Sequence, residues 1–435
     1  MTTESTFQAL LQLPEPWFIA GIDIDAEGEA MHVRIECRLG APLACPQCGV
    51  ACEVYDHAEA RVWRHLDLWQ CQTWLHCRLP RVHCAEHGVK QVQVPWAEPG
   101  SRLSSAFEAR VIATVLGCRT IKAACTLLRL KWDQVNAVMG RAVARGLARR
   151  GAEPMTYLAV DEKAIAKRHR YVSVLYDQRK SPRDDLQRGC VVEVADERRK
   201  ASLITLFASL TPAQQDGIQA VCMDMWEPYI KATTDALPDG ANKIVHDRFH
   251  VMQHANKALN AVRIRETRTL AQQGDTTLKG SRQLWLYADE NVPSQRQADF
   301  EALKNADLQT AKAWAAKETL RRTWAQPDVA SARAHVQAWL ADARAHLPGP
   351  MLDFALLVKE KLEPIIRYCL HPISNGKAEG INSQLMAIQR SARGFRSHAS
   401  FRIAALFHCG KLDLYPAGTT LMSSPDSTGK PEEPF

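Results

Sequence analysis

A chain of 435 residues is too long for one ordinary core and predicts about two to four domains. Hydrophobic residues make up 46%, as in a globular protein, and no stretch approaches the roughly 20 apolar residues of a membrane span. The first residues, Met1–Thr6, lack the basic flank and apolar block of a signal peptide. We therefore expect a cytosolic protein and exclude an integral membrane protein.

The net charge of +7 is concentrated in one segment. Residues 101–150 hold ten Lys or Arg against two acids, a net of +8, so the remaining residues sum to −1. A compact basic segment in an otherwise neutral chain is typical of nucleic-acid binding, although a solvated helical face is an alternative.

The first 100 residues predict a zinc-binding β module. Residues 17–38 alternate weakly and read as a hairpin, and seven of the thirteen cysteines fall before residue 85. Two short-spaced pairs, each followed by glycine, offer a Cys3His tetrahedral site: Cys45, Cys48, Cys84 and His87. Free thiols in a small core are the alternative, and the competing ligands are Cys52, Cys71, Cys77 and His83.

Residues 101–152 predict a helix-turn-helix. Phe107, Val111, Ile112 and Val115 mark an amphipathic helix, Thr120–Leu128 a second, and a third begins at Trp132. An ordinary helical hairpin has the same shape, but the basic charge favours DNA binding. The candidate DNA-binding residues here are Lys131, Arg141 and Arg145 for phosphate, with Gln134 and Asn136 early on the third helix for base edges.

Strand-like runs follow, and acids stand at the ends of two of them. The runs cover Tyr157–Val160, Tyr171–Tyr176, Cys190–Val194, Ile204–Leu210, Ala220–Met223 and Lys243–Val245. Asp161 follows the first run and Asp224 the fifth, while Glu379 opens a late helical stretch. Such an arrangement can hold two divalent metals about 3.5–4 Å apart for phosphoryl transfer. Asp247 also ends a strand, and its alternative role is to cap the helix near Phe249.

The rest of the chain is expected to form helices, followed by a disordered C-terminal tail. Residues 252–370 read as charged helices whose tryptophans form a core, with a helical insertion at about 265–370. Arg390, Arg393 and Arg396 follow Glu379 and could hold DNA phosphates beside the metals, with Gly394 as a helix C-cap. From residue 416 to 435, Gly, Pro, Ser and Thr predict a disordered tail.

Four motifs in one order give the chain a family resemblance. They are Asp161-Glu-Lys163, Met223-Asp-Met225 with Tyr229-Ile230, His246-Asp-Arg-Phe-His-Val251 and Ser374-Asn-Gly-Lys-Ala-Glu379, joined by Gln389–Phe395. From about Leu39 to Cys409 the chain resembles transposases of the ISL3 family, DDE-type enzymes with an RNase H-like core. The family often has Cys at the last zinc ligand, so His87 is a departure.

The resemblance implies a multidomain α+β protein: a zinc module (1–100), a helix-turn-helix domain (101–152) and an RNase H-like catalytic domain with a helical insertion (153–415). Asp161, Asp224 and Glu379 would bind Mg²⁺ or Mn²⁺, and structural Zn²⁺ would sit in the first module. An RNase H-like sheet favours Asp224 over Asp247 as the second acid.

We expect an insertion-sequence transposase that binds terminal inverted repeats and performs metal-dependent DNA cleavage and strand transfer. Its partners would be double-stranded DNA and further copies of itself, as a homodimer or higher oligomer, in the bacterial cytosol near the nucleoid. The alternatives are a non-cutting DNA-binding regulator derived from a transposase and a metal-dependent nuclease without strand transfer.

Overall fold

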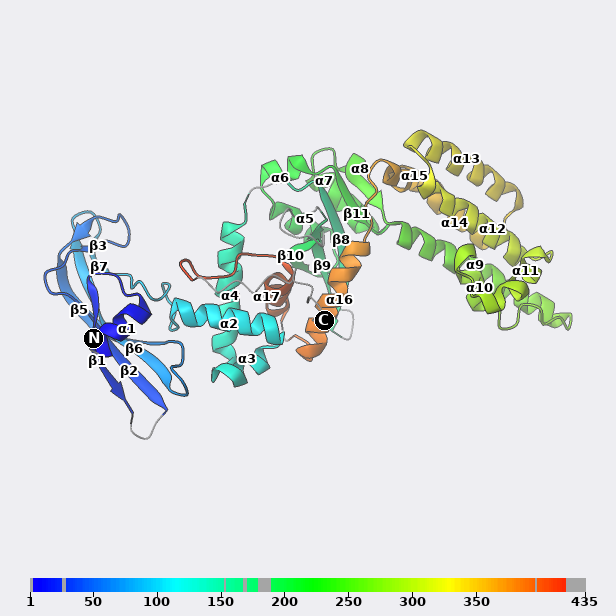
Figure 1. Cartoon of the computed structure of the whole chain (residues 1–435). Coiled ribbons are helices and arrows are strands. Elements are labelled where there is room, and N and C mark those ends of the chain that lie inside the picture. Colours follow the sequence, from blue (N-terminus) through cyan, green and yellow to red (C-terminus); the bar gives the residue numbers. More distant parts are fainter. Residues whose placement is uncertain are drawn as a thin grey trace, which may run out of the picture. The chain divides into compact units, whose positions relative to one another are not determined.

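The computed structural model describes residues 3–25, 29–151, 154–166, 170–178, 189–395 and 397–419. The chain divides into two compact units (Figure 1). The first joins Met1–Arg150 to the C-terminal segment that begins at Leu412, and the second is Gly151–Lys411. Within the described residues, no helix combines the length and the apolar character that a membrane crossing requires.

The first unit begins with a β module around a small apolar core. A five-stranded sheet has the order β1-β2-β6-β5, with β7 on the far part of β6, while β3 and β4 pair separately. Val33 and Leu75 are fully buried on one face and Trp63 nearly so, in agreement with the alternation of these strands. The predicted hairpin over 17–38 is confirmed by antiparallel pairing of β1 with β2. The elements are α1 (Thr3–Leu11), β1 (Trp17–Ile24), β2 (Ala30–Cys37), β3 (Leu43–Ala44), β4 (Ala51–Cys52), β5 (Val54–Arg64), β6 (Gln72–Cys84) and β7 (Gly88–Gln91).

Three helices complete the first unit: α2 (Ser105–Cys118), α3 (Ile121–Leu128) and α4 (Trp132–Arg149). The Ser104 hydroxyl accepts the Phe107 N–H, and the Thr120 hydroxyl accepts the Ala123 N–H, so side-chain caps start α2 and α3. The predicted turn between the second and third helices is present at Arg129, whose φ of 51° ends α3. The segment from Leu412 to Tyr415 returns to α4, where a Cβ at Gly146 would clash with Leu412.

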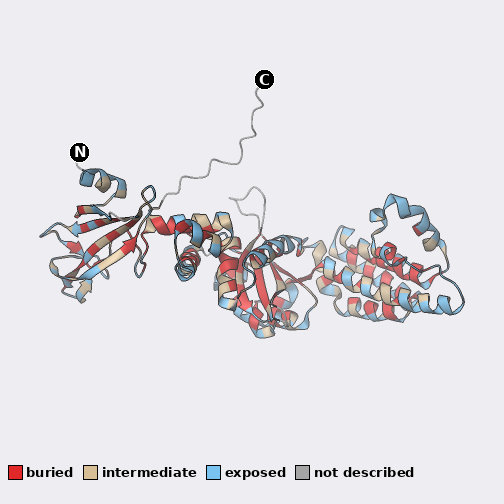
Figure 2. Ribbon diagram, turned by 90° about the horizontal axis from the view of Figure 1, so that it is seen from below, coloured by how far each residue is buried: buried red, intermediate tan, exposed pale blue. Residues whose placement is uncertain are grey.

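A mixed five-stranded sheet forms the centre of the second unit, in the order β10-β9-β8-β11-β12. β8 pairs antiparallel with β9 and parallel with β11, and β11 pairs parallel with β12. Figure 2 shows the strands of this sheet as buried. The elements are β8 (Tyr157–Ala166), β9 (Arg170–Asp177), β10 (Cys190–Asp196), α5 (Lys200–Ala208), α6 (Pro212–Gly217), β11 (Ala220–Met223), α7 (Glu227–Ala236), α8 (Gly240–Lys243) and β12 (Ile244–His246).

One predicted strand is wrong: Ile204–Leu210 falls in helix α5 and the turn after it. Its β-branched and aromatic residues favour a strand locally. However, Leu203, Leu206, Phe207 and Leu210 are buried, at the i, i+3, i+4 and i+7 spacing of one helix face. The helical period therefore outweighs local propensity.

Helices make up most of the remainder of the second unit. Trp285, Trp314 and Trp339 are buried in their common core, and Trp324 packs against it, as predicted. The first of these helices, α9, is continuous from Arg248 to Gln272, in agreement with the helix expected near Phe249. The helices are α9 (Arg248–Gln272), α10 (Arg282–Leu286), α11 (Gln297–Asn305), α12 (Gln309–Arg321), α13 (Val329–His346), α14 (Gly349–Glu360), α15 (Leu362–Ile366), α16 (Gly376–Ser391) and α17 (His398–Cys409), with short 3₁₀ turns at Asp289–Asn291, Ser294–Arg296, Arg322–Ala325 and Arg367–Cys369.

The predicted C-terminal tail lies mostly outside the described residues. Its first residues, Pro416–Thr419, are described, and the Thr419 hydroxyl donates to the Pro416 carbonyl at 2.7 Å. Positions 420–435 lie beyond the described ranges.

Candidate functional site

Asp161, Asp224 and Asp247 come into register on three neighbouring strands. Cys222 pairs with Ala159 between β11 and β8, and Met223 pairs with His246 between β11 and β12. Continuing this parallel register by one or two residues sets the three aspartates side by side. Because neighbouring strands lie about 4.8 Å apart, this register places the three residues at adjacent positions along one edge of the sheet.

Asp161 lies within β8, not at its tip as the sequence suggested. β8 continues to Ala166 because β9 remains paired with it, whereas β11 ends at Met223. Asp161 therefore occupies the position where β8 passes the end of its parallel neighbour. The apolar run before Asp161 marked the buried half of the strand, not its full length.

The Asp161 carboxylate is partly buried and held by two donors. The Asn382 side-chain amide donates to Oδ2 at 2.6 Å, and the Glu162 N–H donates to Oδ1 at 2.8 Å. Burial raises the pKa of Asp161, while these two hydrogen bonds and nearby His250 lower it in part. A partly desolvated carboxylate of this kind gains from a cation partner.

Asp224 follows the end of β11 and faces the first turn of α9. Its Oδ1 accepts the Met225 N–H at 2.6 Å and lies 3.8 Å from His250 Nδ1. The Asp224 side chain is 42% exposed, so water or a ligand can reach it.

Asp247 corrects one expectation. It occupies the N-cap position of α9, but its carboxylate makes no capping hydrogen bond. Asp247 is 1% exposed, and neither oxygen has a hydrogen-bond partner within the described ranges. Burial raises its pKa, while His250 and the backbone N–H groups of Phe249 and Asn375, which approach the carboxylate without completing a hydrogen bond, lower it in part.

Glu379 approaches this edge through its helix and not through a direct contact. α16 lies along β8, since the Gln389 amide donates to the Ile165 carbonyl at 2.7 Å and Asn382 reaches Asp161. Glu379 is one turn before Asn382, so their Cβ atoms are neighbours at about 5–6 Å. The Glu379 side chain is exposed. In the described part of the chain, the three acids Asp161, Asp224 and Glu379 do not form a cluster tight enough to hold an ion.

Cys45, Cys48, Cys84 and His87 do form such a cluster, with all ligand atoms within 4.8 Å of one another. Cys48 Sγ lies 3.7 Å from Cys84 Sγ, and Cys84 Sγ lies 3.5 Å from His87 Nδ1. A zinc tetrahedron with Zn–S of about 2.3 Å and Zn–N of about 2.0–2.1 Å has edges of roughly 3.8 and 3.5 Å. The donor set and its spacing therefore fit a structural zinc ion.

Local backbone geometry builds this cluster. Gly49 and Gly88 adopt φ of 76° and 66°, a conformation that favours glycine, and each follows a ligand pair. Backbone N–H groups of Cys48 and Gln47 lower the pKa of the Cys45 thiol. Among the competing ligands, Cys52 Sγ faces the Val50 carbonyl at 3.4 Å. The Cys77 thiol points into the core, where burial raises its pKa to about 12.

The predicted base-reading residues stand at the start of α4. Lys131 and Gln134 are exposed, and Asn136 is partly buried. The Gln134 side-chain oxygen accepts the Lys131 N–H at 2.8 Å, so it also caps the helix. Trp132, which sequence reasoning treated only as a helix start, is 49% exposed between them.

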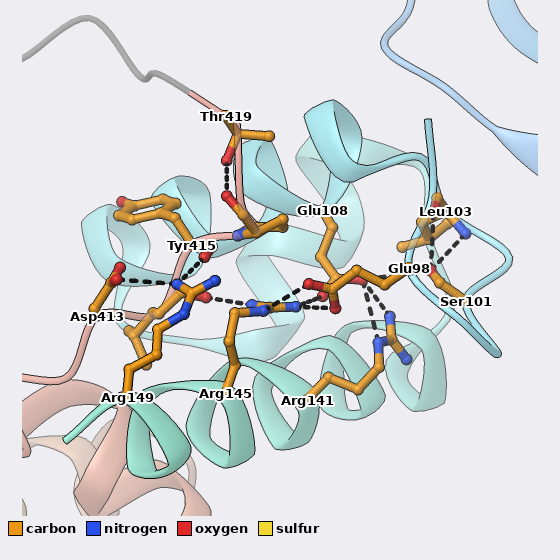
Figure 3. A network of polar contacts seen from close by, with 12 residues as sticks. Glu98, Ser101, Leu103, Glu108, Arg141, Arg145, Arg149, Asp413, Tyr415 and Thr419 are labelled. Carbon is orange, nitrogen blue, oxygen red and sulfur yellow. Dashed lines mark hydrogen bonds and ion pairs between the residues drawn. The ribbon is translucent and has the colours of Figure 1, made fainter. Parts of the chain in front are cut away.

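Arg141 and Arg145 are turned toward carboxylates (Figure 3). Both donate to Glu108, which is 1% exposed: Arg141 Nη2 at 2.6 Å and Arg145 Nη2 at 2.7 Å. Arg145 also pairs with Glu98 and donates to the Leu414 carbonyl. These contacts join α2, α4 and the C-terminal segment, so both arginines have internal partners that the sequence did not reveal.

Of the three arginines that follow Glu379 in the sequence, two lie within the described residues and one does not. Arg390 is exposed on α16 and lies near Lys163, whose pKa is lowered by burial and by Arg390. Arg393 is exposed with φ of 55°, and Gly394 follows with φ of 96° in the turn that ends α16. Arg396 lies outside the described residues.

Sequence reasoning missed two polar residues of the acidic edge. Asn382 holds Asp161 and also accepts the Tyr176 hydroxyl at 2.6 Å. His250 stands beside Asp224 and influences Asp161 and Asp247. The available signal was helical spacing: Asn382 is three residues after Glu379, and His250 is three residues after Asp247.

Comparison with known protein families matches three consecutive parts of the chain. Residues 41–87 match the zinc-finger of transposases IS204/IS1001/IS1096/IS1165, and residues 92–143 match the helix-turn-helix domain of transposase family ISL3. Residues 158–405 match the transposase domain of the same family. The zinc cluster lies inside the first match, and α3 and the first two-thirds of α4 lie inside the second, so the chain carries a zinc-finger and a helix-turn-helix domain of transposase type.

Two curated relatives cover most of the chain. The transposase for insertion sequence element IS1001 of Bordetella parapertussis is 25% identical over 371 residues, 84% of this chain and 89% of the relative. The transposase for insertion sequence element IS1557 of Mycobacterium tuberculosis is 26% identical over 441 residues, 94% of this chain and 96% of the relative. The matched transposase domain spans more than half of this chain, so the chain belongs to the ISL3 family of transposases.

Proposed function

We propose that this protein cleaves DNA at the ends of an insertion sequence and joins the freed 3′-hydroxyl to target DNA. The observation that carries the proposal is the register of Asp161 and Asp224 at one edge of the sheet, with the Glu379 helix fastened to Asp161 through Asn382. The strand order β10-β9-β8-β11-β12 supports an RNase H-like core, in which acids at these positions act together.

Asp161, Asp224 and Glu379 would hold Mg²⁺ or Mn²⁺, because hard oxygen donors suit these ions. The fit rests on Asp161, a partly buried carboxylate whose pKa is raised, and on Asp224, which is open to solvent. When bound, two such ions supply activation of the attacking oxygen and stabilisation of the leaving oxygen.

The protein's own residues orient these acids. Asn382 and the Glu162 N–H fix both oxygens of Asp161, and the Met225 N–H fixes one oxygen of Asp224. Glu379 is exposed near the start of α16, so a metal ion can reach its carboxylate. Arg390, Arg393 and Arg396 would hold the phosphate backbone beside the acids.

The helix-turn-helix would read the terminal inverted repeats. Lys131 would contact phosphate, and Gln134 and Asn136 would contact base edges from the first turns of α4. Arg141 and Arg145 would serve mainly to hold α4 in place, since Glu108 and Glu98 already engage them. The zinc module would grip the repeat beside the helix-turn-helix, and cleavage of paired ends would require a homodimer or higher oligomer.

Two other functions would use the same DNA-binding unit. A regulator derived from a transposase would bind the repeats without cutting, and a nuclease would cut without joining. Purified protein incubated with a labelled element end, Mg²⁺ and a supercoiled plasmid separates all three. We expect a nick at the element end followed by a joined plasmid product, and both to disappear in Asp161→Asn. Cutting without joining would favour the nuclease, and binding alone would favour the regulator.

A further inference from the structure

The exposed face of α9 is free of acidic residues along its whole length. The residues on this face, counted at helical spacing after the first turn, are Gln253, His254, Lys257, Asn260, Ala261, Ile264, Arg265 and Arg268. α9 has a single acid, Glu266, which faces away and caps α12 by accepting the Gln309 and Thr310 N–H groups at 2.7 Å. This face therefore carries unopposed positive charge.

Three cations on this face have no acidic partner. Lys257, Arg265 and Arg268 are exposed, and none forms an ion pair with a carboxylate in the described part of the chain. Elsewhere among the described helices of this region, Lys304, Lys312, Arg321 and Arg333 are all paired with acids. The α9 cations differ in their arrangement, because they lie along one side of a single helix that has no acid on that side.

The face begins at the acidic edge. α9 starts directly after Asp247, and His250 on its first turn lies 3.8 Å from Asp224. His254, one turn later, is still close enough for Asp224 to raise its pKa against burial and Lys257, which lower it. Figure 1 shows α9 leading from the mixed sheet into the helical region of the same unit.

The dimensions fit a short length of duplex DNA. At about 1.5 Å per residue, the path from His250 to Arg268 is roughly 27 Å. Duplex DNA rises about 3.4 Å per base pair, so this path corresponds to about eight base pairs. Lys, Arg, Asn and Gln side chains are the usual donors to phosphate oxygens.

We propose that the α9 face formed by Lys257, Arg265 and Arg268 is a second DNA-binding surface, which holds the duplex next to the scissile phosphate. This surface deepens the proposed function, on which it rests, by extending the DNA contacts from the catalytic edge onto the helical insertion. Its contacts are to phosphate and so independent of sequence.

The test compares two variants that remove the same charge. In the first, Lys257, Arg265 and Arg268 are replaced together by Gln. In the control, Lys279, Arg344 and Lys359 are replaced by Gln; these are exposed cations without ion-pair partners among the described residues, in the same helical region but off α9. Thermal unfolding of both proteins should match that of the parent.

Binding to an element end with flanking duplex is measured across salt concentrations without divalent metal, so that no cleavage is needed. Each lost phosphate contact should reduce the slope of log K against log salt by about 0.9, so the α9 variant should be shallower by about 2.7. The substituted residues span about 16 Å of α9, so the variant's hydroxyl-radical footprint should lose a block of about five base pairs near the scissile phosphate.

An unchanged slope in the α9 variant, or an equal change in the control, would overturn this inference. Failure of the proposed function looks different. If the parent binds DNA but never cleaves it with Mg²⁺ or Mn²⁺, the catalytic proposal fails while the salt slope still decides the role of α9.

Discussion

The replacement of Glu108 by Gln should destabilise the first unit by about 2–3 kcal/mol. Glu108 is 1% exposed and accepts from Arg141 and Arg145. Removing one partner of a buried ion pair costs about 3–5 kcal/mol because the other charge stays buried. The cost here is smaller because Arg145 keeps its pair with Glu98 and Arg141 is 31% exposed to water.

Two measurements check this magnitude. For a unit of this size, about 2–3 kcal/mol lowers the melting temperature by roughly 5–10 °C. Hydrogen exchange should speed up in α2 and α4, which the pair joins, and not in the helices of the second unit. Glu98→Gln is the matched control: its side chain is 31% exposed, so it should cost about 1 kcal/mol or less. A Glu108→Gln protein as stable as the control would show that Glu108 does not hold α2 and α4 together.

Three further predictions concern the first unit. Cys45→Ser should lower the zinc content from one ion to less than one per chain and loosen the β module, and unchanged zinc by elemental analysis would reject that ligand. Burial lowers the pKa of His65 in the folded protein to about 4, whereas an unfolded chain has the ordinary value of about 6.5. As the pH drops from about 6.5 to 4, the unfolded state therefore binds a proton before the folded state does, and the free energy of unfolding falls by about 3 kcal/mol. His65→Gln should flatten this part of the stability curve, and equal acid sensitivity in both proteins would contradict it. Asn136→Ala should weaken binding to the cognate repeat by about 1–3 kcal/mol but leave random DNA unaffected, whereas equal losses on both would indicate a purely electrostatic contact.

The parts of the fold governed by short-range patterns could be predicted from the sequence. Each of the ligand pairs that begin at Cys45 and Cys84 is followed by a glycine that forms a turn, so the spacing of the ligands indicated the zinc cluster. The helix-turn-helix followed from apolar periodicity and charge, and the end of β11 at Met223 from an apolar run that stops at an acid.

Long-range partners could not be predicted in the same way. Asp161 appeared to end a strand because its apolar run ends there, but pairing with β9 continues β8 to Ala166. Arg145 read as a DNA contact because its partners, Glu98 and the Leu414 carbonyl, are 47 and 269 residues away in sequence. Asp247 was predicted to cap the helix near Phe249, yet its buried carboxylate makes no capping hydrogen bond.

Glu379 is the acid whose role depends most on bound metal and DNA, since its exposed side chain stands apart from the two aspartates. The most direct test of the account is therefore cleavage and joining of an element end by Glu379→Gln with Mg²⁺, beside a repeat-binding assay on the same protein. We expect binding to persist and both reactions to fall by more than about 100-fold, because even residues that only orient a metal ligand contribute about 10–100-fold. Full cleavage and joining by a folded Glu379→Gln protein would contradict the proposal that Asp161, Asp224 and Glu379 act together.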